Sequence, residues 1–333
     1  MEKVIFLLGA GASVDAGMPM VTELTKELAA LLPTLPDMNG TPCPAYKEAF
    51  DDIAAHDPSV AENYERFFEW VKLIRDVERE PFRRIINTRI RPELVESLSH
   101  LPFVLCEAIA HLLCSRHAKP CYLAKLADFV PSHGRLKVFS LNYDCCVEEA
   151  CRLGGIDWTT GFDPTAKTWS PNLFQSQNKG INLYKLHGSL HWFMTQDTRT
   201  RSVEPQNPQV LMELSPTENQ HLPSCITVGW EKPELVLGPG SKIQPDDPFL
   251  SLLYEFRCSI KRARTCVVIG YSYKDKHINA LLDSALDDRV NILDVNLSNP
   301  NGHYIADTCY KHLRFRAREA FEEGIISKHL MRN

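Results

Sequence analysis

Short apolar runs recur along the chain. They lack the regular alternation of apolar and polar residues that is typical of a strand with one solvent-exposed face. The runs are Val4–Leu8, Leu136–Leu141, Ile181–Leu186, Leu235–Leu237, Cys266–Ile269 and Val290–Val295. Such a run is typical of a strand that is buried on both faces, as in a parallel sheet. Helical patterns separate many of the runs, so the sequence predicts an α/β fold with a doubly wound parallel sheet.

Two stretches depart from this pattern. From about 45 to 130, strand-like runs are scarce and apolar residues take helical spacing. An example is the set Tyr64, Phe67, Phe68, Val71 and Ile74. The second stretch, from about 195 to 232, is rich in Pro, Asn and Gln and predicts an irregular surface excursion. We therefore expect one Rossmann-like domain over residues 1–333, with a helical insertion after its first βα unit.

Composition narrows the range of partners. The chain has 333 residues, 44% of them hydrophobic and 24% charged, with a formal net charge of -5. A mildly acidic chain gains little from counterion release, so we expect no direct nucleic-acid partner. No apolar stretch has the length of a transmembrane helix, so we expect no membrane partner. The apolar N-terminal run leads straight into a glycine motif and is interpreted as a core strand, which favours a cytoplasmic protein over a secreted one.

The cysteines give no sign of a metal site. The chain has 11 of them but no Cys-x-x-Cys pair, only the adjacent Cys145 and Cys146. A four-cysteine zinc site therefore has no support, and we predict no metal. In a cytoplasmic protein such cysteines are most simply buried small hydrophobic residues.

A glycine motif, Gly9-Ala10-Gly11-Ala12-Ser13, follows the first predicted strand. Glycines at this position let the backbone turn tightly and approach a pyrophosphate, and a following helix points free N–H groups at the anion. The third glycine of the dinucleotide fingerprint is replaced by Val14, which argues against an ordinary dehydrogenase. A purely structural turn between a strand and a helix would explain the same residues.

Polar residues also follow the second predicted strand, in Ser140-Leu141-Asn142-Tyr143-Asp144. Open α/β sheets bind ligands outside the carboxyl ends of their strands, so Asn142 stands where a ligand is expected. Its amide could orient a ribose hydroxyl or a water molecule. The alternative is an N-cap for a helix that follows, a role that suits Asp144 better than Asn142.

A histidine, His187, follows the third predicted strand and precedes a glycine. Imidazole titrates near neutral pH, so it can take a proton from a ribose hydroxyl or from water. A structural role is the alternative, and we interpret His191 and Trp192 as pocket wall or packing.

Two later strands end in the same way. Gly270 and Ser272 close one strand, with Asp275 either capping the next helix or serving the site. Asp294-Val295-Asn296 closes the last strand, from which polar groups would reach an adenosine. Glycine or polar residues thus follow five separate buried strands, which core packing does not require.

In combination, these motifs resemble the signatures of the sirtuin-like family. The glycine loop, with Ser13, Asp15, Gly17 and Pro19, is similar to the sirtuin Gly-Ala-Gly-x-Ser…Gly-x-Pro signature. The motifs occur in the family's order from residue 4 to about 297.

Four further positions carry the resemblance. Asn142-Tyr143-Asp144 is similar to the sirtuin Gln-Asn-x-Asp motif, although Leu141 replaces the Gln, and His187-Gly188 is similar to the catalytic His-Gly. Gly270-Tyr271-Ser272 stands where sirtuins have Gly-Thr-Ser, and Asn296 where they have an adenosine-contacting Asn. The resemblance implies that Asn142 and His187 are catalytic. It implies NAD-binding roles for Gly9, Ala10, Gly11, Ser13, Asp15, Asp144, Gly270, Tyr271, Ser272 and Asn296.

The departures from the family point to one branch of it. Sirtuin deacylases carry a zinc ribbon of two Cys-x-x-Cys pairs, and this chain has none. The residues within the motifs resemble those of the prokaryotic, zinc-free sirtuin-like NAD hydrolases of antiphage defence. That resemblance implies an NAD glycohydrolase that depletes NAD, acting as a homo-oligomer or with a partner ATPase or phage-sensing protein. The alternatives are an NAD-dependent protein deacylase and a non-catalytic sensor of an NAD-derived nucleotide.

Overall fold

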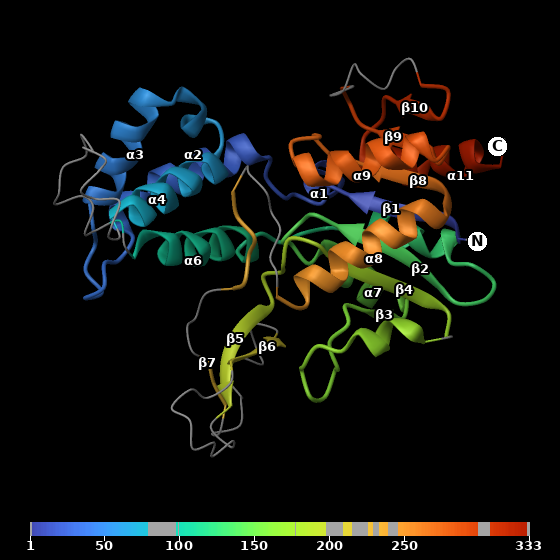
Figure 1. Ribbon diagram of the computed structural model, residues 1–333, viewed down its shortest axis with the longest axis horizontal. Helices are drawn as coiled ribbons and strands as arrows, with labels where there is room; N and C mark the ends of the chain where they lie inside the picture. The colour runs from blue at the N-terminus through green and yellow to red at the C-terminus, as the bar shows by residue number, and fades with distance from the viewer. Residues whose placement is uncertain are drawn as a thin grey trace. The chain divides into compact units, whose positions relative to one another are not determined.

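A computed structural model describes residues 2–78, 98, 100–176, 178–197, 209–214, 226–228, 233–238, 246–298 and 307–331. The chain divides into two compact units (Figure 1). The sheet unit comprises Met1–Met18, His117–Leu235 and Ile243–Asn333, and the helical unit comprises Pro19–Arg116 and Val236–Lys242. Among the helices in these described ranges, none is long and apolar enough to cross a membrane.

The sheet unit is built on a seven-stranded sheet in the order β10-β9-β8-β1-β2-β4-β3. Every pair of neighbouring strands in it is parallel. The strands are β1 (Glu2–Leu8), β2 (Arg135–Ser140), β3 (Trp158–Thr159), β4 (Gly180–Lys185), β8 (Ala263–Ile269), β9 (Asn291–Val295) and β10 (Tyr310–Leu313). The strands β2, β4 and β3 lie on one side of β1, and the later strands β8, β9 and β10 lie on its other side. The direction in which strands are added therefore reverses beside β1. The predicted Rossmann-like, doubly wound α/β fold is confirmed.

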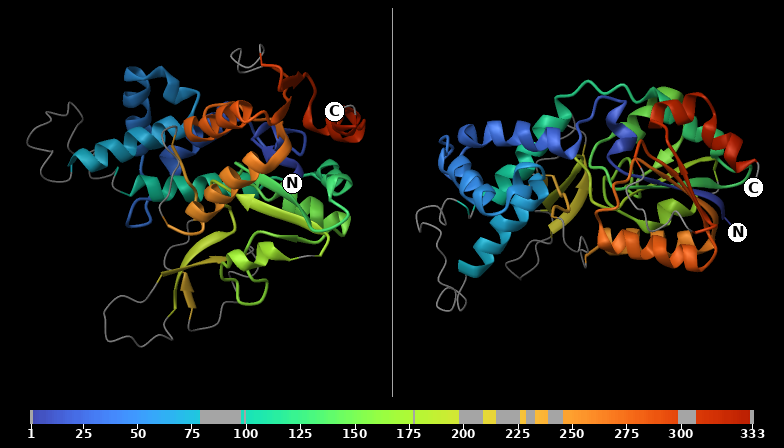
Figure 2. Two further views of the ribbon diagram at one scale, coloured as in Figure 1. Left: turned by 45° about the vertical axis from the view of Figure 1, so that its right-hand side comes forward. Right: turned by 90° about the horizontal axis from the view of Figure 1, so that it is seen from above.

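Both faces of the sheet are buried, which explains the continuous apolar runs in its strands. In β1, Ile5 and Leu7 pack into the core on one face, and Phe6 and Leu8 into the core on the other. The first face is covered by α8 (Phe249–Arg262) and α9 (Lys276–Asp287). The opposite face is covered by η4 (Cys121–Phe129), α7 (Cys146–Gly154), α10 (Ala317–Glu322) and α11 (Ile325–Leu330), as Figure 2 shows.

A second, antiparallel sheet lies in the stretch that the sequence predicted to be irregular. Its order is β6-β5-β7, with β5 at Trp192–Asp197, β6 at Gln209–Glu213 and β7 at Ile226–Val228. Short strands between polar segments carry little periodicity, so the sequence pattern missed them. The strand predicted at Leu235–Leu237 is reduced to a single bridge between Leu235 and Gly188.

The helical unit contains α2 (Val21–Leu31), η1 (Leu32–Thr34), α3 (Ala45–His56), η2 (Pro58–Ala61), α4 (Tyr64–Glu78) and α6 (Leu101–Cys114). Its helices therefore begin earlier than residue 45. On α4, the spacing noted in the sequence buries Tyr64, Phe67, Val71 and Ile74. The ring of Phe67 packs edge-on against Phe50 at 5.0 Å, so Phe67 belongs to the core of this unit.

Candidate functional site

The five sequence motifs follow five strands that are consecutive neighbours in the sheet. Glycine or polar residues come within two residues of the ends of β9, β8, β1, β2 and β4, which stand side by side in that order. Because these strands are parallel, their carboxyl ends meet at one edge of the sheet. The motifs therefore form one continuous row, and the point where the strand order reverses lies inside it.

Hydrogen bonds join each loop of this row to the next. They are Asn296 Nδ2 to Tyr271 O at 3.3 Å, Gly11 N to Gly270 O at 2.9 Å, Asn142 Nδ2 to Gly9 O at 3.0 Å and Leu190 N to Tyr143 O at 3.1 Å. Each loop thus fixes the position of its neighbour, which is the preorganisation that a binding or catalytic site needs.

The glycines of the row are required where the loops after β1 and β8 meet. A Cβ on Gly9 would lie 2.6 Å from Tyr271 Cα, and one on Gly11 would lie 2.7 Å from Gly270 Cα. Gly270 has φ +63°, and a Cβ there would lie 2.3 Å from Ala12 N. These contacts are to backbone atoms, which cannot rotate away as a side chain can. The two loops therefore pack backbone against backbone only with glycine at these positions.

Most N–H groups of the glycine loop are used inside the protein. Those of Gly9, Gly11, Ala12 and Ser13 donate to carbonyl oxygens of the chain at 2.9 to 3.0 Å. Among the described residues, no acceptor takes the N–H of Ala10, which lies on an exposed residue. The helix that follows, α1, is only Gly11–Val14, so its dipole is small. An anion at this loop would meet the Ala10 amide first.

The amide of Asn142 is held in one orientation by two acceptors. The residue is 8% exposed, and its Nδ2 donates to Gly9 O at 3.0 Å and to Ser13 Oγ at 3.1 Å. Both amide protons are thereby used, and Oδ1 remains to accept a hydrogen bond. The N-cap position of α7 is occupied by Cys145, so neither Asn142 nor Asp144 is the N-cap, although Asp144 Oδ1 accepts a hydrogen bond from Cys146 N at 3.0 Å.

His187 stands directly beyond β4, next to the loop of Asn142. It is 2% exposed, and its ring centroid lies 6.1 Å from that of His277 on α9. The turn after it depends on Gly188, with φ +87°, where a Cβ would lie 2.1 Å from Glu234 O. Ser140 and Lys185 are paired in the sheet, so Asn142 and His187 each stand two residues beyond that pair.

A buried lysine at the end of β4 connects the loop of His187 to the loop of Asn142. Lys185 is 1% exposed, and its ammonium donates to the carbonyl oxygens of Tyr143 and Asp144 and lies 3.3 Å from Glu148 Oε1. Burial by itself would lower the pKa of Lys185, but Glu148 and the other acidic neighbours raise it above the ordinary value. Burial raises the pKa of Glu148, and Lys185 partly offsets that effect.

The remaining predicted residues on the β1 and β8 loops make contacts within the protein. The carboxylate of Asp15 accepts hydrogen bonds from the Arg316 guanidinium at 3.2 Å and from the Arg318 backbone N–H at 3.1 Å. The hydroxyl of Tyr271 accepts from Asp275 N at 3.1 Å and lies 2.9 Å from Asn279 Oδ1. Ser272 is exposed. Asp275 occupies the N-cap position of α9 without a side-chain capping bond.

Asn296 lies partly buried beside an acidic group after β9. Its Nδ2 donates to Asp294 Oδ1, and Tyr310 donates to the other carboxylate oxygen at 2.5 Å. Asp294 is fully buried, and this burial raises its pKa, against the lowering effect of hydrogen bonds from Tyr310 and Asn296. Asn296 is thus oriented by Asp294 of β9, whereas Asn142 is oriented by the loop after β1.

Two residues that hold the loops of the candidate site in place, Lys185 and Tyr122, were not assigned a role from the sequence. Lys185 was part of a motif, but its place inside a strand hid the contacts that its ammonium makes. Tyr122 donates from its hydroxyl to Ala12 O at 2.5 Å, across 110 residues of chain. Only the fold brings Tyr122 to the glycine loop, so the local sequence held no signal for it.

No cluster of three or more His, Cys, Asp or Glu that could hold a metal occurs within the described ranges. The cysteines there are free, and several of them, including Cys106, Cys146, Cys151 and Cys266, are buried as expected. Cys114 and Cys121 are exposed, so burial does not account for every described cysteine.

Searches found no matching family model and no matching curated protein. Solved structures of Sir2 proteins do resemble the chain. A Sir2 homologue in complex with NAD is 16% identical, with a TM-score of 0.44, 99% of this chain and 90% of that chain covered. A Sir2 bound to an acetylated peptide is 12% identical, with a TM-score of 0.45 and coverage of 98% and 94%. At such low similarity, the role of each residue has to come from the geometry of this chain.

Proposed function

We propose that the chain binds NAD and hydrolyses the bond between nicotinamide and ribose. The observation that carries this proposal is the amide of Asn142, fixed by Gly9 and Ser13 beside the switch point, with His187 on the next loop. A buried, oriented amide oxygen on one loop and a histidine on the neighbouring loop offer a positioning group and a proton acceptor. Both groups lie at the sheet edge where open α/β folds bind ligands.

In the proposed reaction the bond between ribose C1′ and the pyridinium nitrogen breaks, and its electron pair stays with nicotinamide. The ribose passes through a state that resembles an oxocarbenium ion, as in glycoside cleavage. Asn142 Oδ1 holds a ribose hydroxyl or the attacking water, and His187 takes the proton that the water loses. The products are nicotinamide, ADP-ribose and one proton, and the step uses no metal.

The other residues of the row would hold the rest of NAD. The pyrophosphate would meet the Ala10 amide on the loop that Gly9 and Gly11 shape. Asn296 and Ser272, after the strands on the far side of β1, would face the adenosine. Asp15, Asp144, Ser13, Gly270 and Tyr271 would then support the site through the contacts described above rather than by touching NAD.

Incubation of the purified protein with NAD and no peptide tests the proposal. Chromatography should show nicotinamide and ADP-ribose in equal amounts, and Asn142→Ala should abolish both. Nicotinamide released only in the presence of an acylated peptide would identify a deacylase instead. Binding of NAD or ADP-ribose without any turnover would identify a sensor.

We further propose that this activity depletes NAD in antiphage defence and is restrained by assembly. A free NAD hydrolase would harm its host, so activity should depend on a homo-oligomer, a partner ATPase or a phage-sensing protein. Light scattering across protein concentrations, run beside the NAD assay, tests this. A monomer with full activity at every concentration, unchanged by a partner, would contradict it.

A further inference from the structure

The C-terminal segment of the chain holds the loop after β1 at the point where α1 ends. Arg318 of α10 donates from its backbone N–H to Asp15 Oδ2 at 3.1 Å, and from its guanidinium to the carbonyl oxygen of Asp15 at 2.5 Å. The guanidinium of Arg316 lies 3.2 Å from the other carboxylate oxygen of Asp15. Two consecutive turns of contact thus join segments from the two ends of the sequence.

Tyr122 extends this contact into the glycine loop. The centre of its ring lies 5.3 Å from the guanidinium carbon of Arg318, and its hydroxyl donates to Ala12 O at 2.5 Å. The electrons of a tyrosine ring attract a cation that lies above it. Tyr122 is 3% exposed, so core packing restricts the movement of its ring. Arg318 therefore contacts both Asp15 and the side chain that holds Ala12.

The helix α1 depends on such contacts for its position. It comprises only Gly11–Val14, and a helix of four residues is unstable in isolation because the cost of nucleation is not recovered. Carbonyl groups at the end of a helix need partners from outside it. Here Tyr122 and Arg318 supply them to Ala12 and Asp15.

The position of α1 in turn determines the geometry of the candidate site. Ser13 lies in α1, and its hydroxyl accepts a hydrogen bond from Asn142 Nδ2 at 3.1 Å. Gly9, just before α1, accepts from the same nitrogen at 3.0 Å. A shift of α1 would therefore move the acceptors that orient the Asn142 amide, together with the N–H of Ala10.

We propose that Arg318 is a positioning residue for the candidate site. It fixes α1 through Asp15 and Tyr122, and through α1 it fixes the amide of Asn142 and the N–H of Ala10. The effect on turnover rests on the proposed NAD hydrolysis, whereas the effect on the glycine loop needs no substrate. The two effects are therefore measured separately.

Amide hydrogen exchange of the full chain, followed by mass spectrometry, measures the glycine loop directly. Peptides that cover residues 9–18 should exchange at least about threefold faster in Arg318→Ala than in the wild type, because the loop opens locally more often. Peptides from α9 should exchange equally in both proteins. Arg318→Lys keeps a cation that can reach Asp15 and should restore at least half of the lost protection.

Kinetics with NAD measure the consequence for the site. A misplacement of about 1 Å can lower a rate on the order of 100-fold, so Arg318→Ala should reduce kcat/KM by roughly 10- to 100-fold. KM should rise at least about fivefold, because the displaced loop binds the pyrophosphate less well. A substitution that only lowered the folded fraction would reduce the apparent kcat and leave KM unchanged.

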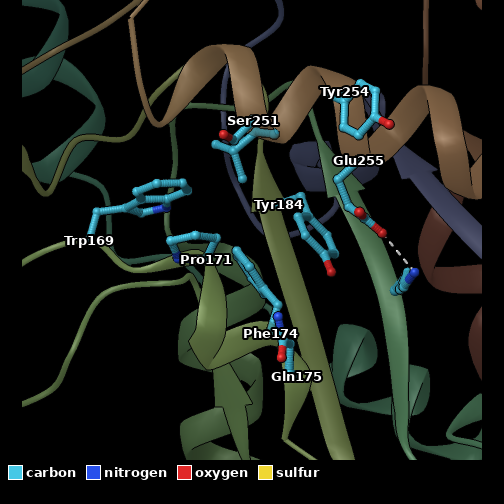
Figure 3. A pocket seen from close by; sticks show the side chains of 10 residues that line it. Trp169, Pro171, Phe174, Gln175, Tyr184, Ser251, Tyr254 and Glu255 are labelled. Carbon is cyan, nitrogen blue, oxygen red and sulfur yellow. Dashed lines mark hydrogen bonds and ion pairs between the residues drawn. The ribbon is translucent and has the colours of Figure 1, made fainter.

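The ion pair of Lys137 and Glu255 provides a matched control. It also joins distant segments of the sheet unit, with Nζ and Oε1 2.8 Å apart beside a hollow of about 350 Å³ between α8 and η5 (Pro171–Gln175) (Figure 3). The helix α8 covers the face of the sheet opposite α10. Glu255→Gln should therefore change neither KM nor the exchange of the glycine loop. Arg314→Ala, which removes an exposed arginine of the C-terminal segment, should also leave both unchanged.

The proposal is overturned if residues 9–18 exchange in Arg318→Ala as they do in the wild type. It is also overturned if exchange is faster but KM is unchanged, or if Glu255→Gln reproduces both effects. If the wild type releases no nicotinamide from NAD, the proposed function fails, and the exchange of the loop alone decides whether Arg318 holds it.

Discussion

The side-chain nitrogen of Asn142, in the loop after β2, donates a hydrogen bond at 3.1 Å to the hydroxyl of Ser13, which follows β1. The same nitrogen donates to Gly9 O at 3.0 Å, so both of its protons point at the glycine loop. The amide could not be turned over without placing Oδ1 against the Gly9 carbonyl. Two loops that are far apart in the sequence thus determine which atom of Asn142 is offered to a substrate.

Asn142→Asp tests this relationship, because the carboxylate has the same shape but cannot donate. It would face the Gly9 carbonyl with a negative charge, and we expect a loss of about 1–3 kcal/mol in the free energy of unfolding. Nicotinamide release should fall at least ~100-fold. Ser13→Ala leaves the Gly9 acceptor in place and should cost only about 0.5–1.5 kcal/mol. Urea unfolding of both variants measures this; equal stability of Asn142→Asp and wild type would contradict the orientation described.

His187→Ala should also reduce nicotinamide release at least ~100-fold, the usual effect of losing an acid–base group. The side chain is 2% exposed, so circular dichroism must first show that the variant folds. His329→Ala is the control, since His329 lies on α11 and its Nδ1 contacts only the local carbonyl of Ile325 in the described contacts. A folded His187→Ala variant with near-normal turnover would remove His187 from the mechanism.

The apolar runs predicted most of the central sheet because these strands are buried on both faces. The run Val4–Leu8 became β1 at Glu2–Leu8, and Cys266–Ile269 became β8 at Ala263–Ile269. The strand β10, Tyr310–Leu313, was missed because it is a short edge strand with polar residues at its centre. A buried strand can be recognised as an apolar run in the sequence only where successive residues of the strand are all buried.

The candidate site was predictable as far as it consists of residues that directly follow strands. Asn142 and His187 were proposed in this way, and the sheet order places them on neighbouring loops. The partners that hold them were not predictable: the Lys185 contact with the Asp144 carbonyl depends on strand pairing, and Tyr122 reaches Ala12 from another part of the chain. Contacts between distant segments leave no local pattern in one sequence.

Lys185→Met should be strongly destabilising. The substitution leaves the Glu148 carboxylate buried without its cation and two carbonyl oxygens without a donor, so we expect a loss of about 3–5 kcal/mol. Adding Glu148→Gln removes the buried charge and should recover part of this loss. The control is Arg152→Ala, which breaks an exposed ion pair with Glu149 on the same helix and should cost less than about 1 kcal/mol. Chemical unfolding of the four proteins gives the comparison; a double variant no more stable than Lys185→Met would refute the assigned pairing.

In the helical unit, Asp57 should make the free energy of unfolding fall at acidic pH. Its carboxylate accepts hydrogen bonds from Ser59, Trp70 and Arg66, which lower its pKa below the ordinary value of 3.8. A folded pKa below the unfolded one means that this stabilisation is present above about pH 4 and is lost as the pH falls further. The difference in urea midpoint between wild type and Asp57→Asn should therefore be largest near pH 7 and shrink by pH 3. A constant or widening difference would show that the charge of Asp57 is not involved.

Gly270 and Gly324 offer a matched pair for testing why glycine is needed where the β1 and β8 loops meet. Both have left-handed backbone conformations, with φ +63° and +64°. A Cβ on Gly324 meets no atom within 4 Å, whereas a Cβ on Gly270 would lie 2.3 Å from the backbone of Gly11 and Ala12. Gly324→Ala should therefore show only the conformational cost of about 1–2 kcal/mol.

Gly270→Ala should show that same cost and, in addition, separate the two loops. The hydrogen bond from Gly11 N to Gly270 O would lengthen, and the glycine loop that orients Asn142 would move with it. We expect Gly270→Ala to be clearly less stable than Gly324→Ala and to lose nicotinamide release, while Gly324→Ala retains it. Thermal unfolding and the NAD assay on both variants provide the measurement. If the two substitutions cost the same and both variants turn over NAD, close packing of these loops does not explain the glycine at position 270.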